Sequence, residues 1–334
     1  MKRIKYFLPI IALVFIVLFS CNNDDDDGVV YIPPRERDEE AVASQIEIEE
    51  YLETHFYNYE EFENPSSDFD YIVKLDTIAG DNALKTPLMQ QVDFKNVTDI
   101  HDDTVTYKLY YLKVRQGEGD TPNFTDILTM IYSGSLLTDG TVFDSTVNPE
   151  LPLDLTQTIE GFQEALVEFS GATGFIDNGD GTLTFENYGV GAVFIPSGLG
   201  YFNTPPTSEI PFYSQMIFTF QLYSVKRGDQ DGDGILSVFE DLDGDGFELN
   251  DDTDENGIPN FADPDDDGDG RLTINEVEAH EYTINLGATD PELGPNEIEM
   301  YRETDDEAGE ITIYTIDFID ENNDGVPDYL DDEL

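Results

Sequence analysis

The sequence has few of the side chains on which acid–base, nucleophilic and metal catalysis usually depend. Its 334 residues include three histidines, one cysteine and no tryptophan. General acid–base and covalent catalysis both need partner groups within hydrogen-bond reach of each other. Any catalysis by this chain is therefore expected to depend on the shape of an apolar pocket and on the exclusion of water from it.

Basic residues are also scarce, with 15 Lys and Arg against 74 Asp and Glu and a formal net charge of −59. Binding to nucleic acid needs Lys and Arg to neutralise phosphates, so no nucleic-acid partner is expected, and the carboxylates favour cations instead. The single cysteine excludes an intrachain disulfide. The aromatic content of 12% can supply a sizeable core, and the length suggests about two domains.

The N-terminus has the pattern of an export signal. A short basic stretch precedes an apolar run over residues 6–20, which is shorter than the ~20 residues that a membrane span needs. Residues 1–20 are therefore predicted to be a signal peptide. The ending LFSC resembles a bacterial lipobox, which implies a lipid on Cys21 and an anchor in the cell envelope, on the periplasmic face or the outer surface of the outer membrane. Residues 21–34 are predicted to form an acidic tether.

Residues 35–103 are predicted to form an N-terminal extension. Val42, Ile46, Ile48, Leu52 and Phe56 recur at helical spacing, which predicts one amphipathic helix packed beside the main domain. Residues 58–103 mix polar loops with short apolar runs, and no chemistry is assigned to them.

Strand signals become dense in residues 104–227. Runs rich in β-branched and aromatic residues over 107–114, 127–134 and 214–225 predict strands, and Asp139-Gly140 marks a turn. Residues 159–169 read as one short helix. The prediction is an α+β domain, in which an antiparallel sheet carries a short helix on one face.

The same region resembles FKBP-type peptidyl-prolyl isomerase domains. The motifs of that family occur in order over residues 117–122, 132–134, 139–140, 143–145, 159–162, 195–201, 210–211 and 218–222. The resemblance implies an FKBP-like sheet wrapped on a short helix. It also implies an enzyme that isomerises X-Pro bonds in proline-containing peptides or unfolded exported proteins and needs no cofactor.

Site roles follow from this resemblance. Phe162 takes the floor position where the family usually has Trp, and Ile210 lies on a flap over the mouth. The apolar walls are Tyr132, Phe143, Leu153, Ile159 and Phe218. The Tyr201 hydroxyl and the Ile159 backbone N–H would donate to substrate carbonyls. Asp144, held by Tyr132, would act through its charge. Phe202 departs from the family, which usually has Gly there.

Such a pocket suits the reaction because no bond to a nucleophile is required. Rotation about an X-Pro bond crosses a barrier of about 18–20 kcal/mol, since it breaks amide resonance. A dry aromatic pocket that prefers the less polar, twisted amide lowers this barrier. A rate gain of several thousandfold needs only about 5 kcal/mol of such preference.

Residues 228–334 are predicted to form an acidic calcium-binding segment. From residue 229 onward there are 37 acids and two bases, Arg271 and Arg302. Five loops starting at 229, 241, 252, 265 and 320 follow the pattern D-x-D-x-D-G-x5-E, the first and fourth in full. The segment resembles EF-hand loops and, more closely, thrombospondin type 3 repeats. Only the loops at 229 and 265 have enough following sequence for an EF-type half-helix.

In these loops odd-numbered acids point inward, Gly at position six allows the sharp turn, and position seven offers its carbonyl. Oxygen donors in this number suit Ca²⁺ and do not suit Zn²⁺. The expectation is a stiff, calcium-stabilised module. The predicted ligands are Asp229, Asp231, Asp233, Ile235, Glu240, Asp241, Asp243, Asp245, Asp252, Asp254, Asn256, Asp263, Asp265, Asp267, Asp269, Arg271, Glu276, Asp320, Asn322, Asp324 and Asp331.

Two functions therefore follow from the sequence. One is a lipid-anchored, exported peptidyl-prolyl isomerase with a calcium-stabilised tail. The alternative is a non-catalytic module on the cell envelope, which binds proline peptides in the same pocket and uses the repeats for adhesion. Phe162 and Phe202 leave room for the alternative.

Overall fold

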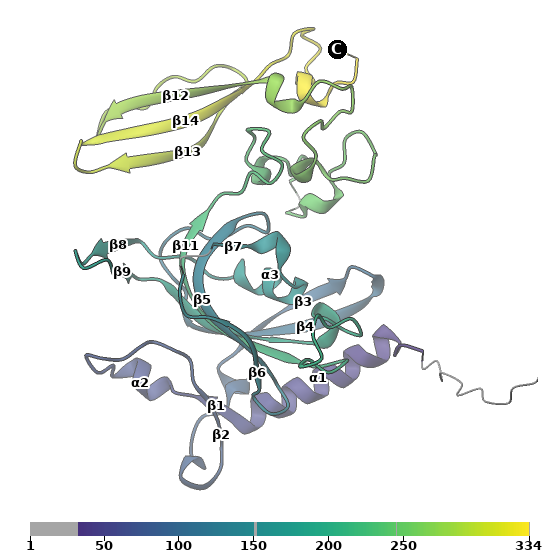
Figure 1. Ribbon diagram of the computed structural model, residues 1–334, viewed down its shortest axis with the longest axis vertical. Helices are drawn as coiled ribbons and strands as arrows, with labels where there is room; N and C mark the ends of the chain where they lie inside the picture. Colours follow the sequence, from purple (N-terminus) through teal and green to yellow (C-terminus); the bar gives the residue numbers. More distant parts are fainter. Residues whose placement is uncertain (1–32, 150–151, 245, 334) are drawn as a thin grey trace, which may run out of the picture. The chain divides into compact units, whose positions relative to one another are not determined.

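The computed structural model describes residues 33–149, 152–244 and 246–333. The chain divides into two units, Met1–Pro34 and Arg35–Leu334, and the second is described here (Figure 1). The predicted signal peptide, Cys21 and most of the acidic tether lie outside the described residues. Within those residues, every helix is too short or too polar to span a membrane.

The centre of the second unit is an antiparallel seven-stranded sheet. Its strands lie in the order β3, β4, β10, β11, β5 and β6, and β7 pairs with β5. The strands are β3 (Asp93–Asp99), β4 (Asp102–Arg115), β5 (Ile127–Leu136), β6 (Val142–Thr146), β7 (Leu153–Asp154), β10 (Gly189–Ile195) and β11 (Met216–Lys226). The sheet begins at Asp93, so part of the predicted extension belongs to it.

One face of the sheet packs on the short helix α3 (Glu160–Leu166), as the sequence predicts (Figure 1). Side chains alternate between the two faces of each strand, and Tyr111, Val193 and Phe218 lie on the α3 side. Phe162, Ala165 and Leu166 of α3 complete this core. The residues of the predicted pocket either belong to this core, as Phe162 does, or pack against it, as Tyr132 and Phe143 do.

The other face is covered by α1 (Arg37–Thr54), so helices lie on both faces and not on one. Ile48 and Leu52 of α1 pack with Tyr110, Phe194 and Ile217, the strand residues that point away from α3. Because both faces are covered, every residue of β10 is buried. The predicted packing element is therefore part of the main core.

The predicted apolar face of α1 is only half right. Val42 and Ile46 are 61% and 53% exposed, whereas Glu40 and Ser44 are buried with Ile48 and Leu52. The two polar residues replace apolar ones because their hydrogen bonds are satisfied inside, by Ser197 and Gln215 among others. A buried polar group that is fully paired does not incur the large cost of an unpaired one.

Smaller elements surround the sheet. They are β1 (His55–Tyr57), α2 (Tyr59–Glu63), β2 (Leu75–Thr77), η1 (Gly80–Asn82), η2 (Leu88–Gln90), η3 (Leu155–Gln157), β8 (Gly174–Asp177), β9 (Leu183–Glu186) and η4 (Ser197–Leu199). Strands β8 and β9 form the hairpin that the sequence predicts around residues 177–182.

The acidic segment contains a sheet that the sequence analysis missed. Strands β12 (Val277–Asn285), β13 (Glu297–Asp305) and β14 (Glu310–Phe318) are antiparallel, with β14 in the centre. Ile316 of β14 packs with Ile235 and Tyr329 from two of the acidic loops. The segment therefore has a small apolar core of its own and does not depend on metal alone.

Each acidic loop ends in a short 3₁₀ turn. The turns are η5 (Ser237–Phe239), η6 (Glu248–Asn250), η7 (Asn260–Ala262), η8 (Thr273–Asn275) and η9 (Asp328–Leu330). The loops at 229 and 265, which alone have enough following sequence for an EF-type half-helix, are thus followed by 3₁₀ turns and not by α-helices. The chain runs from η8 almost directly into β12, which leaves no length for a helix.

The face of α1 can be tested by matched truncations. Leu52→Ala should lower the free energy of unfolding by about 2–5 kcal/mol, because Leu52 is 0% exposed in the core. Val42→Ala, on the exposed side of the same helix, should change it by less than about 0.5 kcal/mol. Urea unfolding measures both, and equal losses would contradict the observed orientation of α1.

Candidate functional site

An aromatic cluster marks the predicted pocket. Phe162 on α3 is 3% exposed, and its ring centroid lies 4.8 Å from that of Phe218 on β11 and 6.0 Å from that of Tyr132 on β5. The Phe143 ring on β6 lies edge-on to Phe218 at 5.6 Å. Four predicted site residues, which come from four elements, therefore pack together in one aromatic cluster.

Gly134 is needed for this arrangement. A Cβ at that position would lie 2.6 Å from the Phe218 ring and 3.1 Å from the Phe143 ring. Any larger residue would push one of these rings out of place. The glycine two residues after Tyr132 therefore makes room for the aromatic wall.

A polar edge borders the aromatic cluster. The Tyr132 hydroxyl donates a hydrogen bond to Oδ2 of the exposed Asp144 at 2.9 Å. Burial and this carboxylate raise the pKa of Tyr132 to about 12. Burial and the Asp144 charge also raise the pKa of Tyr201. The two phenols are therefore neutral, and among the described residues the Asp144 carboxylate has the Tyr132 hydroxyl, and no base or nucleophile, as its side-chain hydrogen-bond partner.

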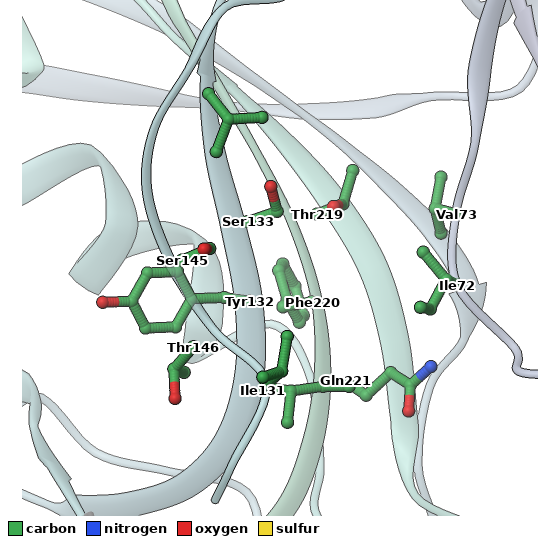
Figure 2. A pocket seen from close by; sticks show the side chains of 12 residues that line it. Ile72, Val73, Ile131, Tyr132, Ser133, Ser145, Thr146, Thr219, Phe220 and Gln221 are labelled. Carbon is green, nitrogen blue, oxygen red and sulfur yellow. The ribbon is translucent and has the colours of Figure 1, made fainter.

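The other predicted pocket residues have different surroundings. Leu153 lies on β7, and Ile159 is the N-cap residue of α3; both are partly buried against the α3 core. Ile210 lies between β10 and β11 and is buried. A cavity of about 290 Å³ is lined by Ile72, Val73, Tyr132 and others. Figure 2 shows these side chains, with the Tyr132 ring pointing away from Ile72 and Val73. Of the predicted pocket residues, Tyr132 alone lines this cavity.

The five acidic loops share the backbone geometry that their sequence predicts. The glycine at position six has a positive φ in each loop, from 79° to 100°. In the loops at 229, 241, 252 and 320, the carboxylate at position one accepts a backbone N–H from within its own loop, for example Gly232 to Asp229 at 2.9 Å and Gly325 to Asp320 at 3.1 Å. Only glycine adopts such a turn readily.

Carboxylates converge in three of these loops. Within the described residues, ligand atoms lie within 4.8 Å of one another in four groups: Asp229, Asp231 and Asp233; Asp233, Glu240 and Asp266; Asp241, Asp243 and Asp251; and Asp265, Asp267 and Asp269. The structure thus brings together most of the predicted ligands of the loops at 229, 241 and 265. Asp245 lies outside the described residues.

Asp266 and Asp251 were missed by the sequence analysis. Asp266 is the second residue of the loop at 265, so its side chain points away from its own loop and joins Asp233 and Glu240 of the first loop. Asp251 completes the loop at 241, one residue before the predicted Asp252. The extra acid in DDDGDG, compared with DQDGDG, was the available signal for Asp266.

The remaining predicted ligands lie close to one another but form no group of three acids. In the loop at 252, the Asn256 amide donates to Asp263 at 2.6 Å and to Asp254 at 3.0 Å. In the loop at 320, the Asn322 amide donates to Asp331 at 2.8 Å and to Asp324 at 3.3 Å. Arg271 lies 3.7 Å from Glu276, in the loop that carries the group of Asp265, Asp267 and Asp269.

The donor set around Glu240 fits a hard cation. Both Glu240 carboxylate oxygens are buried and have no hydrogen-bond partner among the described residues, and the same holds for Oδ2 of Asp233 and Oδ1 of Asp266. Burial and neighbouring acids raise the pKa of Glu240 to about 10. Buried charges without partners are costly, and Ca²⁺ coordination by six to eight oxygens would satisfy them.

Comparison with known families supports part of this assignment. Residues 119–223 match the family model of FKBP-type peptidyl-prolyl cis-trans isomerases. Residues 230–291 match a second model, described as BamM C-terminal. Residues 119–223 are therefore similar to FKBP-type peptidyl-prolyl cis-trans isomerases, and the region that follows is similar to a different family.

Individual relatives are similar to part of the chain. An outer membrane protein MIP from Legionella longbeachae is 32% identical over 36% of this chain and 45% of its own length. The FKBP-type isomerase FkpA of Aeromonas hydrophila is 30% identical over 37% of this chain and 41% of its own. The crystal structure of FkpA from Escherichia coli is 21% identical, covers 56% of this chain and 62% of that one, and has a TM-score of 0.31. The chain thus spans less than half the length of the Legionella and Aeromonas relatives.

Proposed function

We propose that the chain is an exported peptidyl-prolyl cis-trans isomerase, anchored to the cell envelope through Cys21 and stabilised by calcium in its C-terminal segment. The observation that carries the proposal is the aromatic cluster of Phe162, Phe218 and Tyr132, bordered by the Tyr132–Asp144 hydrogen bond. The FKBP-type match over 119–223 includes all of these residues.

The geometry suggests how such a site would work. A proline ring placed on Phe162 would lose its contact with water, and its amide would enter an apolar space. The twisted amide is less polar than the planar one, so this environment favours it. The Tyr201 hydroxyl would hold a substrate carbonyl, while Asp144, already bonded to Tyr132, would act through its charge on the twisting amide. No cofactor takes part in this scheme.

The calcium proposal rests on the acidic loops. Asp233, Glu240 and Asp266 would share one cation, which would join the loop at 229 to the loop at 265. The ion would neutralise the buried carboxylates, and the other predicted ligands would act within their own loops. Because the small core around Ile235 and Tyr329 spans two of the loops, cation binding would also stabilise that core.

Export and lipidation are proposed from the sequence of residues 1–34 alone. One relative is described as an outer membrane protein, which agrees with a location in the cell envelope. Exported proline-containing or unfolded proteins would then be the substrates.

The pocket can be tested by its floor. Phe162→Ala should lower kcat/KM for isomerisation of a short proline peptide at least tenfold, because the proline ring loses its apolar support. Phe175→Ala, at a ring 61% exposed on β8, should leave the rate within about twofold, since surface substitutions have small effects. Undiminished catalysis in Phe162→Ala would refute the site assignment. Peptide binding without turnover by the unaltered chain would favour the non-catalytic alternative.

The shared cation site can be tested by neutralising its ligands. Calcium should raise the melting temperature of the unaltered chain, and Asp266→Asn or Glu240→Gln should weaken the tightest calcium-binding step at least tenfold in titration calorimetry. Asp306→Asn, at an exposed acid between β13 and β14, preserves the change in charge but should bind calcium as before. If all three variants bind calcium equally, Asp266 and Glu240 are not ligands.

A further inference from the structure

Two aromatic residues between β10 and β11 have a left-handed backbone. Phe202, directly after Tyr201, has φ of 47°, and Tyr213 has φ of 61°. The Tyr213 N–H donates to the Phe202 carbonyl at 2.7 Å, and their rings lie edge to face at 5.0 Å. Bulky residues disfavour this conformation, so it persists only where the surroundings hold it in place.

Arginines at the start of α1 cover both of these rings. The Arg37 guanidinium lies 4.5 Å from the centroid of Phe202, and that of Arg35 lies 4.4 Å from the centroid of Tyr213. The Arg35 backbone N–H also donates to the Tyr213 hydroxyl at 3.0 Å. Cations over aromatic faces are attracted by the ring quadrupole. Each strained residue is therefore held by one arginine.

Arg37 is itself fixed to the interior of the domain. It forms an ion pair with Asp99, whose side chain is fully buried and also accepts a hydrogen bond from the Tyr107 hydroxyl at 3.0 Å. Arg37 further donates to the Gly198 carbonyl at 3.4 Å. The guanidinium thus connects the core to the Tyr201 loop at two places.

A second set of bonds ties both ends of this loop to α1. The Glu40 carboxylate is buried and accepts from the Ser197 hydroxyl at 3.0 Å and from Arg35 at 2.6 Å. The side-chain oxygen of Gln215 accepts a hydrogen bond from the Ser197 backbone N–H at 2.9 Å. The side-chain NH₂ of Gln215 donates to the Glu47 carboxylate at 2.8 Å. The loop between residues 197 and 215 contains Tyr201, Ile210 and both strained aromatic residues.

We propose that the start of α1, which lies outside the matched residues 119–223, positions Tyr201 for catalysis by holding the 197–215 loop. Arg37 is the main positioning residue, acting through Phe202, and Glu40 acts through Ser197. This inference rests on the proposed isomerase function. It makes the N-terminal extension a working part of the site in addition to a packing partner of the sheet.

A double-mutant cycle in the full chain tests the kinetic part. Arg37→Met should lower kcat/KM about fivefold or more in a proline-peptide assay, mainly through kcat, and Arg37→Lys should recover part of the loss. In a Tyr201→Phe background, Arg37→Met should have little further effect, because its action passes through Tyr201. Arg115→Met serves as the control, since Arg115 covers Tyr188 at 4.0 Å elsewhere in the sheet. Fully additive losses, or an equal loss in the control, would overturn the proposal.

Amide hydrogen exchange tests the proposed clamp, by which Arg35, Arg37 and Glu40 hold residues 197–215, independently of activity. Arg37→Met should increase exchange over residues 197–215 at least tenfold while β4, β5 and β11 stay protected. Arg35→Met alters a side chain that is 58% exposed, so the fold should tolerate it, and it should increase exchange only around Tyr213. Unchanged exchange in both variants would refute the clamp. If the unaltered chain were inactive but exchange rose as expected, the isomerase function would fail and the clamp would stand.

Discussion

The rest of the structure depends on the burial of β10 and β11 on both faces. Val193 and Phe218 pack toward α3, whereas Phe194 and Ile217 pack toward α1. The loop that joins these two strands carries Tyr201, and it therefore lies where both helices can reach it. On one side of the sheet lies Phe162 of α3, the proposed floor of the pocket. The other supplies the arginines and the buried glutamate that hold the loop. The position of the proposed pocket and the packing of the N-terminal extension thus both depend on the burial of this sheet on its two faces.

The acidic segment is dominated by carboxylates, and not by apolar side chains. Its charges repel one another, and several of them are buried. Turns with glycine at position six direct alternate carboxylates inward, and Glu240 is buried at 0% exposure together with Asp233 and Asp266. Burying three carboxylates is unfavourable unless a cation or protons accompany them. The small core of Ile235, Ile316 and Tyr329 supports these loops but offers little apolar area. Shared cation binding would therefore add much of the stability of this segment.

Much of the site could be predicted from the sequence because its motifs are local. The hydrogen bond between Tyr132 and Asp144 and the positive φ of the loop glycines both come from short, ordered patterns. The face of α1 could not be predicted from hydrophobicity, because Glu40 and Ser44 are buried against partners more than 150 residues away in the sequence, such as Ser197. Asp266 was missed because it serves a neighbouring loop. The sheet of β12 to β14 was hidden by acids that alternate with its few apolar residues.

The proposed isomerase site would work by shape and desolvation, without proton transfer. A pH profile alone would be ambiguous, because burial and the charges of Asp99 and Glu164 raise the pKa of Glu160, the first residue of α3, to about 7. The most direct measurement is the solvent deuterium isotope effect on kcat/KM for isomerisation of a proline peptide, on the pH plateau. The ratio of kcat/KM in H₂O to kcat/KM in D₂O is expected to be close to unity, because no bond to hydrogen breaks as the amide rotates. A ratio of about 2 or more would show proton transfer in the rate-limiting step and would contradict the proposed mechanism.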